Sequence, residues 1–239
     1  MRVNFSYIKV FVLVLLVVFL FAFSTHRNSN RKVVQPIIKF IGESQPFITH
    51  EAVSKLLIQN QQTVTGKPKD IIDLSQLEAA LNSSPMIKSA QVHMSVDGVL
   101  TAEIEQKRPI ARVRTNMSYY IDDEGSFMPL SANYTARVPL VTGNIEKNNL
   151  TSIYNIAKKI NEDEFLKIHI TSINQNSDNT LDLYVRDNNF KVQLGSLKQL
   201  DKKINNLKAF YKKAIKDKTI DSYRVVNLKF DSQVICTKK

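Results

Sequence analysis

The chain has 239 residues, enough for one large or two small domains, and 43% of them are hydrophobic, which allows a buried core. Its formal net charge is +11, but it has neither zinc-finger spacing nor an aromatic RNA-binding signature, and its lysines are scattered. We interpret the charge as solvated lysine and predict no nucleic-acid partner; attraction to anionic lipid or to an acidic partner is the alternative. The single cysteine, Cys236, excludes an internal disulfide.

An apolar segment stands near the N-terminus. The residues from Val10 to Phe23 read "VFVLVLLVVFLFAF" without a polar interruption. A helix needs about 17 to 25 residues to span a bilayer, so this segment is long enough only if its neighbours from Phe5 to Ser24 are included. A cleaved signal peptide is the alternative, because the sequence from Ala22 to Ser24 resembles a small-residue cleavage site. We favour an uncleaved anchor, and both interpretations export the rest of the chain.

A β-α-α-β-β pattern follows a polar and basic linker. "PIIKFIGE" predicts a strand, and Thr49 is placed to cap a helix in "FITHEAVSKLLIQN". A second helix is predicted in "DLSQLEAALNSSP", with Asp73 or Ser75 as its cap. Two segments of alternating apolar residues then flank the Asp97-Gly98 pair. This arrangement predicts a β-hairpin with a two-residue type I′ turn.

A second region starts directly after the hairpin, at "KRPIARV". Strands are predicted in "ARVRT", "SYYIDDEGSFMPLS", "RVPLVTG", "LKIHITSINQ", "TLDLYVRD", "NFKVQLG", "YRVVNLKF" and "QVICTKK". Helices are predicted over residues 150–161 and 197–216, and a turn over residues 187–189. A terminal strand can lie at a sheet edge, where unpaired backbone groups invite a strand from another protein; blunting of that edge by lysines is the alternative.

Candidate catalytic residues are few. Asp122, Asp123 and Glu124 form an acidic cluster, but they precede Gly125 in a predicted hairpin turn, where Asp is a favoured turn residue. The four histidines lack the spacing of a zinc site, and nothing in the sequence supplies a base for Cys236. We therefore predict no catalytic, cofactor or metal site and no enzymatic activity. An anchored envelope enzyme that uses Asp123 or Cys236 is the alternative.

The ordered set of these segments resembles the FtsQ/DivIB family of bacterial cell-division proteins. The resemblance rests on "IKFIGE", "FITHEAV", "SPMIKSAQV", "KRPIARV", "YYIDDEGSFMPLS", "VPLVTG" and "VVNLKF" in this order. It implies an α+β protein with an N-terminal transmembrane helix, a β-α-α-β-β POTRA domain and a mixed β domain with packed helices. The implied boundaries are a cytoplasmic tail over 1–6, an anchor over 7–24, a juxtamembrane linker over 25–35, the POTRA domain over 36–108 and the β domain over 109–239.

The resemblance also implies a function. Members of the family are non-catalytic scaffolds of the divisome, anchored in the inner membrane by a single helix, with a periplasmic ectodomain enriched at the septum. They connect early and late division proteins by binding FtsB and FtsL, and the final strands of their β domain receive a strand from FtsB. By position, "VVNLKF" matches this terminal segment, so the predicted partner-binding residues are Val226, Leu228, Lys229 and Phe230.

Another POTRA-bearing envelope assembly factor is the alternative within this fold. Such proteins carry a transmembrane barrel, and the residues that remain after Val113 are too few for 16 strands of about 10 residues each. Phe230 stands where many members of the family have Tyr, so an aromatic ring is kept and its hydroxyl is lost.

Overall fold

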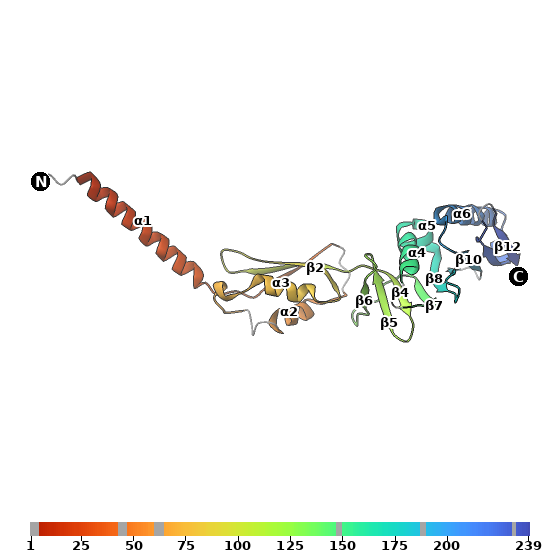
Figure 1. The fold of residues 1–239 in the computed structure, drawn as a ribbon, viewed down its shortest axis with the longest axis horizontal. Helices are drawn as coiled ribbons and strands as arrows, with labels where there is room; N and C mark the ends of the chain where they lie inside the picture. The colour runs from red at the N-terminus through yellow and green to blue at the C-terminus, as the bar shows by residue number, and fades with distance from the viewer. Residues whose placement is uncertain (1–4, 43–46, 60–64, 147–149, 187–189, 231–232) are drawn as a thin grey trace. The chain divides into compact units, whose positions relative to one another are not determined.

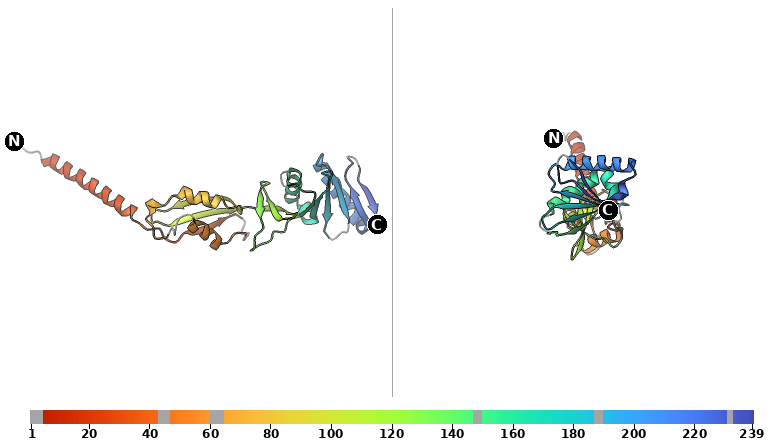
Figure 2. Two further views of the ribbon diagram at one scale, coloured as in Figure 1. Left: turned by 60° about the horizontal axis from the view of Figure 1, so that its bottom comes forward. Right: turned by 90° about the vertical axis from the view of Figure 1, so that its right-hand side faces the viewer.

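The computed structural model describes residues 5–42, 47–59, 65–146, 150–186, 190–230 and 233–239 (Figures 1 and 2). The chain divides into two compact units, Met1–Gln106 and Lys107–Lys239. Most of the predicted cytoplasmic tail and the predicted turn over residues 187–189 lie outside the described residues. The two units are called unit 1 and unit 2 below.

Unit 1 begins with helix α1, Phe5–Ser29, which contains the apolar segment. Its part from Tyr7 to Ser29 is long and apolar enough to cross a membrane, and none of that apolar surface is covered by the protein. The helix is therefore a candidate membrane anchor. Within the predicted juxtamembrane linker over 25–35, α1 continues to Ser29, and Val33 is only 2% exposed in the core of unit 1.

The rest of unit 1 is a three-stranded sheet with two helices packed on one of its faces. Strand β3 is central, parallel to β1 and antiparallel to β2. The elements in chain order are β1 Ile37–Ile41, α2 His50–Gln59, the 3-10 turn η1 Lys69–Ile71, α3 Leu74–Asn82, β2 Ile87–Met94 and β3 Leu100–Gln106. The β-α-α-β-β order has the predicted form.

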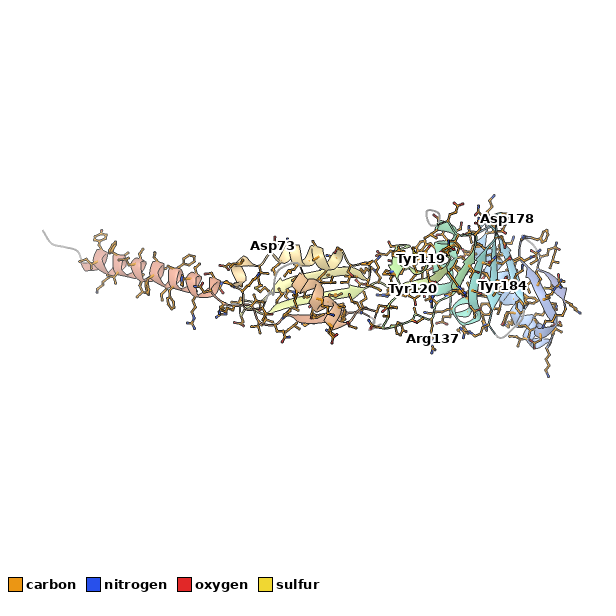
Figure 3. All side chains as sticks on the ribbon, turned by 90° about the horizontal axis from the view of Figure 1, so that it is seen from below. Asp73, Tyr119, Tyr120, Arg137, Asp178 and Tyr184 are labelled. Carbon is orange, nitrogen blue, oxygen red and sulfur yellow. The ribbon has the colours of Figure 1, made fainter. Side chains whose placement is uncertain are left out.

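Side-chain caps begin helices α2 and α3 of unit 1. The hydroxyl of Thr49 accepts a hydrogen bond from the N–H of Ala52 at 3.2 Å, directly before α2. At α3 the cap is Asp73, whose carboxylate accepts from the N–H of Gln76 at 3.1 Å (Figure 3). These bonds satisfy N–H groups that a helix leaves unpaired in its first turn, so both helices begin where the sequence predicts.

The hairpin between β2 and β3 differs from the predicted one. Gly98 has a φ of 84°, whereas Asp97 is not among the residues with positive φ, so the turn is not type I′. Instead the N–H of Gly98 donates to Ser95 at 3.0 Å, and the hydroxyl of Ser95 accepts from Val99 at 3.2 Å. Residues 95–99 thus form a longer loop, and the Ser95 hydroxyl favours it by holding the loop's far end.

Unit 2 contains one nine-stranded mixed sheet, in the order β12-β11-β10-β9-β8-β7-β4-β5-β6. Its strands are β4 Pro109–Arg114, β5 Ser118–Asp122, β6 Phe127–Pro129, β7 Leu140–Gly143, β8 Ile170–Gln175, β9 Leu181–Val185, β10 Lys191–Gly195, β11 Tyr223–Asn227 and β12 Ile235–Lys238. Its helices are α4 Thr151–Glu162, α5 Glu164–His169 and α6 Leu200–Lys216, with the 3-10 turn η2 Ile220–Ser222.

The three helices of unit 2 lie on the same side of this sheet (Figure 1). The parallel strands β10 and β11 are joined by a crossover through α6, whose buried Lys203 donates to the carbonyls of Leu194 and Ser196 at 3.0 and 2.7 Å. On the other face, the hydroxyl of Tyr120 accepts from the N–H of Ala136 at 3.2 Å (Figure 3). Among the described residues, helices cover one face of this sheet only.

Helix α5 replaces the first part of a predicted strand. The segment "LKIHITSINQ" was predicted to be extended, but residues up to His169 are helical and β8 begins at Ile170. The carboxylate of Asp163 accepts from the N–H of Leu166 at 3.2 Å, and the rings of Phe165 and His169 lie 4.5 Å apart one turn later. A side-chain cap and an aromatic contact between positions i and i+4 thus stabilise this short helix.

Gly98 provides a test of the hairpin geometry. A Cβ at Gly98 would lie 2.9 Å from the backbone oxygen of Lys32, whereas Gly66, with a similar φ of 86°, has nothing within 4 Å. We expect Gly66→Ala to cost about 1 kcal/mol through its positive φ and Gly98→Ala to cost about 2 to 3 kcal/mol because of the added clash. Native-state hydrogen exchange of the β2 and β3 amides measures the loss of unfolding free energy in both variants. Equal losses in the two variants would contradict the close approach of Gly98 to the backbone of Lys32.

Candidate partner-binding edge

The outer strands of the two sheets are the places where another chain can bind through its backbone. An outer strand presents unpaired N–H and C=O groups, which natural proteins either block or use to bind an added strand. The edges are β1 and β2 in unit 1 and β6 and β12 in unit 2. These four edges differ in how far they are closed to an added strand.

The β2 edge is closed by side chains of α3. The amide of Asn82 accepts from the N–H of Ala90 at 2.8 Å and donates to the carbonyl of the same residue at 3.3 Å. The carboxylate of Glu78 accepts from the N–H of Val92 at 3.1 Å. These three bonds occupy backbone groups that an added strand would need. At the other edge of this sheet, β1 exposes Ile37 and Ile41.

The β6 edge is short. Its strand contains three residues and ends at Pro129, which has no N–H to donate. Both properties are among the ways in which proteins prevent pairing at an edge. The opposite edge of the same sheet is therefore the better template for an added strand.

That opposite edge is β12, which is paired on one side only, with β11. The N–H of Lys239 donates to the carbonyl of Ser222 at 2.9 Å, so it faces the sheet. Because N–H groups alternate in direction along a strand, the N–H of Lys238 is directed to the free side. Cys236 packs against the core, while the side chains of Ile235 and Thr237 are exposed.

The four predicted partner-binding residues fall into two pairs. Val226 and Leu228 are 0% and 1% exposed and belong to the hydrophobic core, whereas Lys229 and Phe230 are exposed in the connection from β11 to β12. Strand β11, which contains Val226, is not an outer strand, because it lies between β10 and β12. The assignment of all four residues to a partner interface stays a prediction.

The connection after β11 is held close to the sheet. The N–H of Leu228 donates to the carbonyl of Gln193, and the N–H of Lys229 donates to the side chain of Asn227, each at 2.9 Å. The stem of Lys229 lies against Gly195, where a Cβ would be 3.0 Å from it. Lys229 therefore has a fixed backbone, and Phe230 follows it with its ring 47% exposed.

Sequence reasoning missed Ile235 and Thr237, the exposed side chains of the outer strand. Their segment was predicted to be a strand, and its alternation is visible in the sequence. What local sequence does not contain is the order of strands in the sheet, which places β12 outside β11. A strand's position at an edge follows from long-range pairing rather than from its own residues.

Two of the residues considered for catalysis, Asp122 and Cys236, have surroundings that fit a role in the fold. The carboxylate of Asp122 accepts from the N–H groups of Glu124 and Ser126 at 3.1 and 2.6 Å and pairs with Lys107 at 2.8 Å, so it organises the turn. Burial raises the pKa of the Cys236 thiol, which keeps the thiol protonated and weakly nucleophilic. Seven strand spacings of about 4.8 Å separate β5, which ends at Asp122, from β12, which contains Cys236, so these two residues lie roughly 34 Å apart across the sheet.

Metal ligands do not gather in the part of the chain that the structure describes. No group of three or more His, Cys, Asp or Glu side chains there could hold a metal ion. Among the described residues, the fold combines a candidate anchor helix with a sheet edge that is free to pair, an arrangement suited to an anchored binding protein.

Comparison with known protein families identifies this binding protein more closely. The family described as "FtsQ/DivIB, C-terminal related" matches residues 108–237, which is more than half of the chain, and a POTRA-like domain matches residues 42–105. The chain therefore belongs to the FtsQ/DivIB family of cell-division proteins. No curated protein matches it. The family is non-enzymatic, and the apolar helix suggests a membrane anchor.

The closed β2 edge gives a prediction of its own. Asn82→Ala leaves a buried donor and acceptor of Ala90 without their partner, which costs about 1 to 3 kcal/mol of stability. Gln91→Ala, an exposed substitution on the same strand, is the matched control and should change stability by less than about 0.5 kcal/mol. Hydrogen exchange at the Ala90 and Val92 amides measures the effect. Unchanged Ala90 protection in Asn82→Ala would show that α3 does not close this edge.

Proposed function

We propose that the chain is a non-catalytic scaffold of the divisome that binds FtsB-type and FtsL-type proteins and so links early and late division proteins. The observation that carries the proposal is the free edge of β12, at the end of the domain that matches the FtsQ/DivIB family. In this proposal an extended segment of the FtsB-type partner pairs with β12 and continues the nine-stranded sheet.

Strand addition supplies affinity and specificity through different groups. Main-chain hydrogen bonds to the outer edge give affinity, and alternate side chains give specificity. Ile235 and Thr237 offer an exposed apolar and an exposed hydroxyl side chain on β12. The exposed ring of Phe230 adds a large aromatic surface beside them in sequence, and burial of such a ring contributes strongly at interfaces. Val226 and Leu228 contribute indirectly, because their burial in the core holds β11 in place beside β12.

The proposal includes a location in the cell. We propose that α1 anchors the chain in the inner membrane as a single span, with units 1 and 2 on the periplasmic side and the protein enriched at the division septum. The apolar helix and the family match support this placement. Imaging a fluorescent fusion that is active in the periplasm checks it, and an even signal over the whole envelope would contradict septal enrichment.

The experiment that tests strand addition uses the backbone of β12. The full chain, in detergent, is co-purified with FtsB-type and FtsL-type proteins of the same organism. Lys238→Pro removes an N–H that faces away from the sheet, so the fold is kept while a hydrogen bond to the added strand is lost. We expect binding of the FtsB-type partner to fall about tenfold or more, which corresponds to about 1.4 kcal/mol.

Lys238→Ala is the matched control, because it removes the same charge and keeps the N–H. Binding should remain within about twofold of the unchanged chain. Circular dichroism shows whether both variants are folded. Equal loss in the two variants would assign the effect to charge instead of to the backbone, and capture of neither partner by the folded, unchanged chain would remove the scaffold proposal.

Phe230 provides a side-chain test of the same interface. Phe230→Ala should weaken binding of the FtsB-type partner by about 30-fold, equivalent to about 2 kcal/mol, if the ring is an interface hot spot. Ile215→Ala is the control, since Ile215 is a similarly exposed apolar residue, 54% exposed on α6. Titration calorimetry measures both affinities. A Phe230→Ala affinity equal to that of Ile215→Ala would remove Phe230 from the interface.

A further inference from the structure

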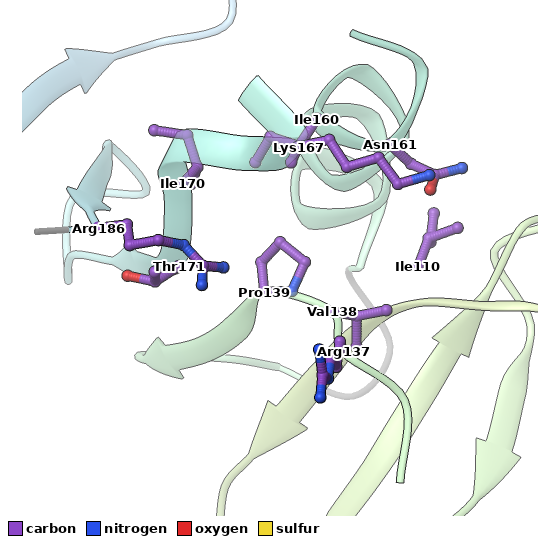
Figure 4. Close-up of a pocket in the computed structure, with 10 residues that line it drawn as sticks. All are labelled: Ile110, Arg137, Val138, Pro139, Ile160, Asn161, Lys167, Ile170, Thr171 and Arg186. Atoms are coloured by element: carbon purple, nitrogen blue, oxygen red, sulfur yellow. The ribbon is translucent and has the colours of Figure 1, made fainter. Parts of the chain in front are cut away.

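A basic cavity opens in unit 2 away from β12. Its volume is about 260 Å³, and it lies between the segment that leads into β7, the end of α4, helix α5 and the start of β8 (Figure 4). Three cationic side chains line it, those of Arg137, Lys167 and Arg186 (Figure 4). They come from three separate segments of the chain, so only the fold brings them together.

No acidic residue is among the ten described residues that line the cavity. At the connection of α4 and α5, Glu162 lies 4.0 Å from Lys158, and Asp163 pairs with Lys208. The positive charges of Arg137 and Lys167 on a concave surface concentrate a positive potential there, which attracts an anion. The charge of this cavity is therefore complementary to an anionic group.

Backbone and side-chain bonds hold the walls of the cavity in place. The N–H of Arg186 donates to the carbonyl of His169 at 2.7 Å, and its Nε donates to the carbonyl of Ile168 at 3.1 Å. The second bond orients the planar guanidinium before any ligand arrives. On the other wall, the carbonyl of Pro139 accepts from the N–H of Arg112 at 2.9 Å. A fixed guanidinium loses less freedom on binding than a mobile one.

The floor of the cavity is apolar and buried, formed by Ile110, Ile160 and Ile170. Sites for drug-sized ligands usually measure about 300 to 1,000 Å³, so this cavity suits a smaller group. Phosphate sites typically present backbone N–H groups, whereas the floor here offers methyl groups. A carboxylate on a short hydrocarbon chain suits both the cationic and the apolar side chains of the cavity. Its charge would face the cations, and its methylene groups would contact the isoleucines.

We propose that this cavity binds a carboxylate, the Asp or Glu side chain of an acidic segment in a protein partner. Four strand spacings of about 4.8 Å separate β8 from β12, so the cavity lies roughly 20 Å from the proposed strand-addition edge. The proposal does not depend on strand addition, and its test contains neither FtsB-type nor FtsL-type protein. The two proposals can therefore fail separately.

The test uses the full chain in a zwitterionic detergent, with ¹³C-labelled isoleucine methyl groups. Glutarate is the carboxylate probe, glutaramide is its uncharged analogue, and inorganic phosphate is the competing anion, all at constant ionic strength. We expect glutarate to shift the methyl signals of Ile110, Ile160 and Ile170 with one saturable curve, and glutaramide to leave them unchanged. Phosphate should bind at least tenfold more weakly than glutarate.

Two double variants locate the effect. Arg137→Ala with Lys167→Ala removes two charges from the cavity and should weaken glutarate binding at least tenfold, as followed on the Ile170 methyl. Lys202→Ala with Lys212→Ala removes two charges from the exposed face of α6 and should change it less than twofold. Absence of saturation with glutarate, tighter binding of phosphate, or an equal loss in both double variants would each overturn the proposal.

Discussion

One row of apolar side chains crosses the sheet of unit 2, and the register of that sheet depends on it. Each member is paired with the next across neighbouring strands, and all of them face the helical layer. A slip of one residue in any strand would turn its member from the core to solvent. The row consists of Tyr119, Val113, Val141, Ile173, Leu183, Val192, Val226 and Cys236, from β5 to β12.

The row separates core residues from interface residues near the end of the sheet. Val226 belongs to the row and is fully buried, although the family resemblance placed it among the partner-binding residues. Cys236 ends the row and fixes the inner face of β12, while the outer edge of the same strand stays unpaired in the described part of the chain. A strand whose side chains are anchored and whose backbone is available is a suitable receptor for another strand.

Local chemistry predicted the elements of this protein better than their arrangement. Thr49 and Asp73 cap helices as expected, because capping needs only residues within one turn. The predicted two-residue turn after β2 was wrong, because the hydroxyl of Ser95 stabilises a longer loop than the one that the Asp-Gly pair favours. The place of β11 inside the sheet could not be predicted, since it depends on pairing between residues 34 positions apart in the chain. The basic cavity could not be predicted from the sequence either, because its three cationic side chains come from segments that are distant in the chain.

The crossover through α6 has a consequence for how the protein folds. Strands β10 and β11 are parallel, so they pair only across a long connection that contains α6, and such long-range pairing is slow compared with hairpin closure. Strands β11 and β12 are close in the chain and can pair with each other first. The receptor edge therefore joins the sheet only when the slow pairing of β10 with β11 is complete, and until then β10 is itself an outer strand.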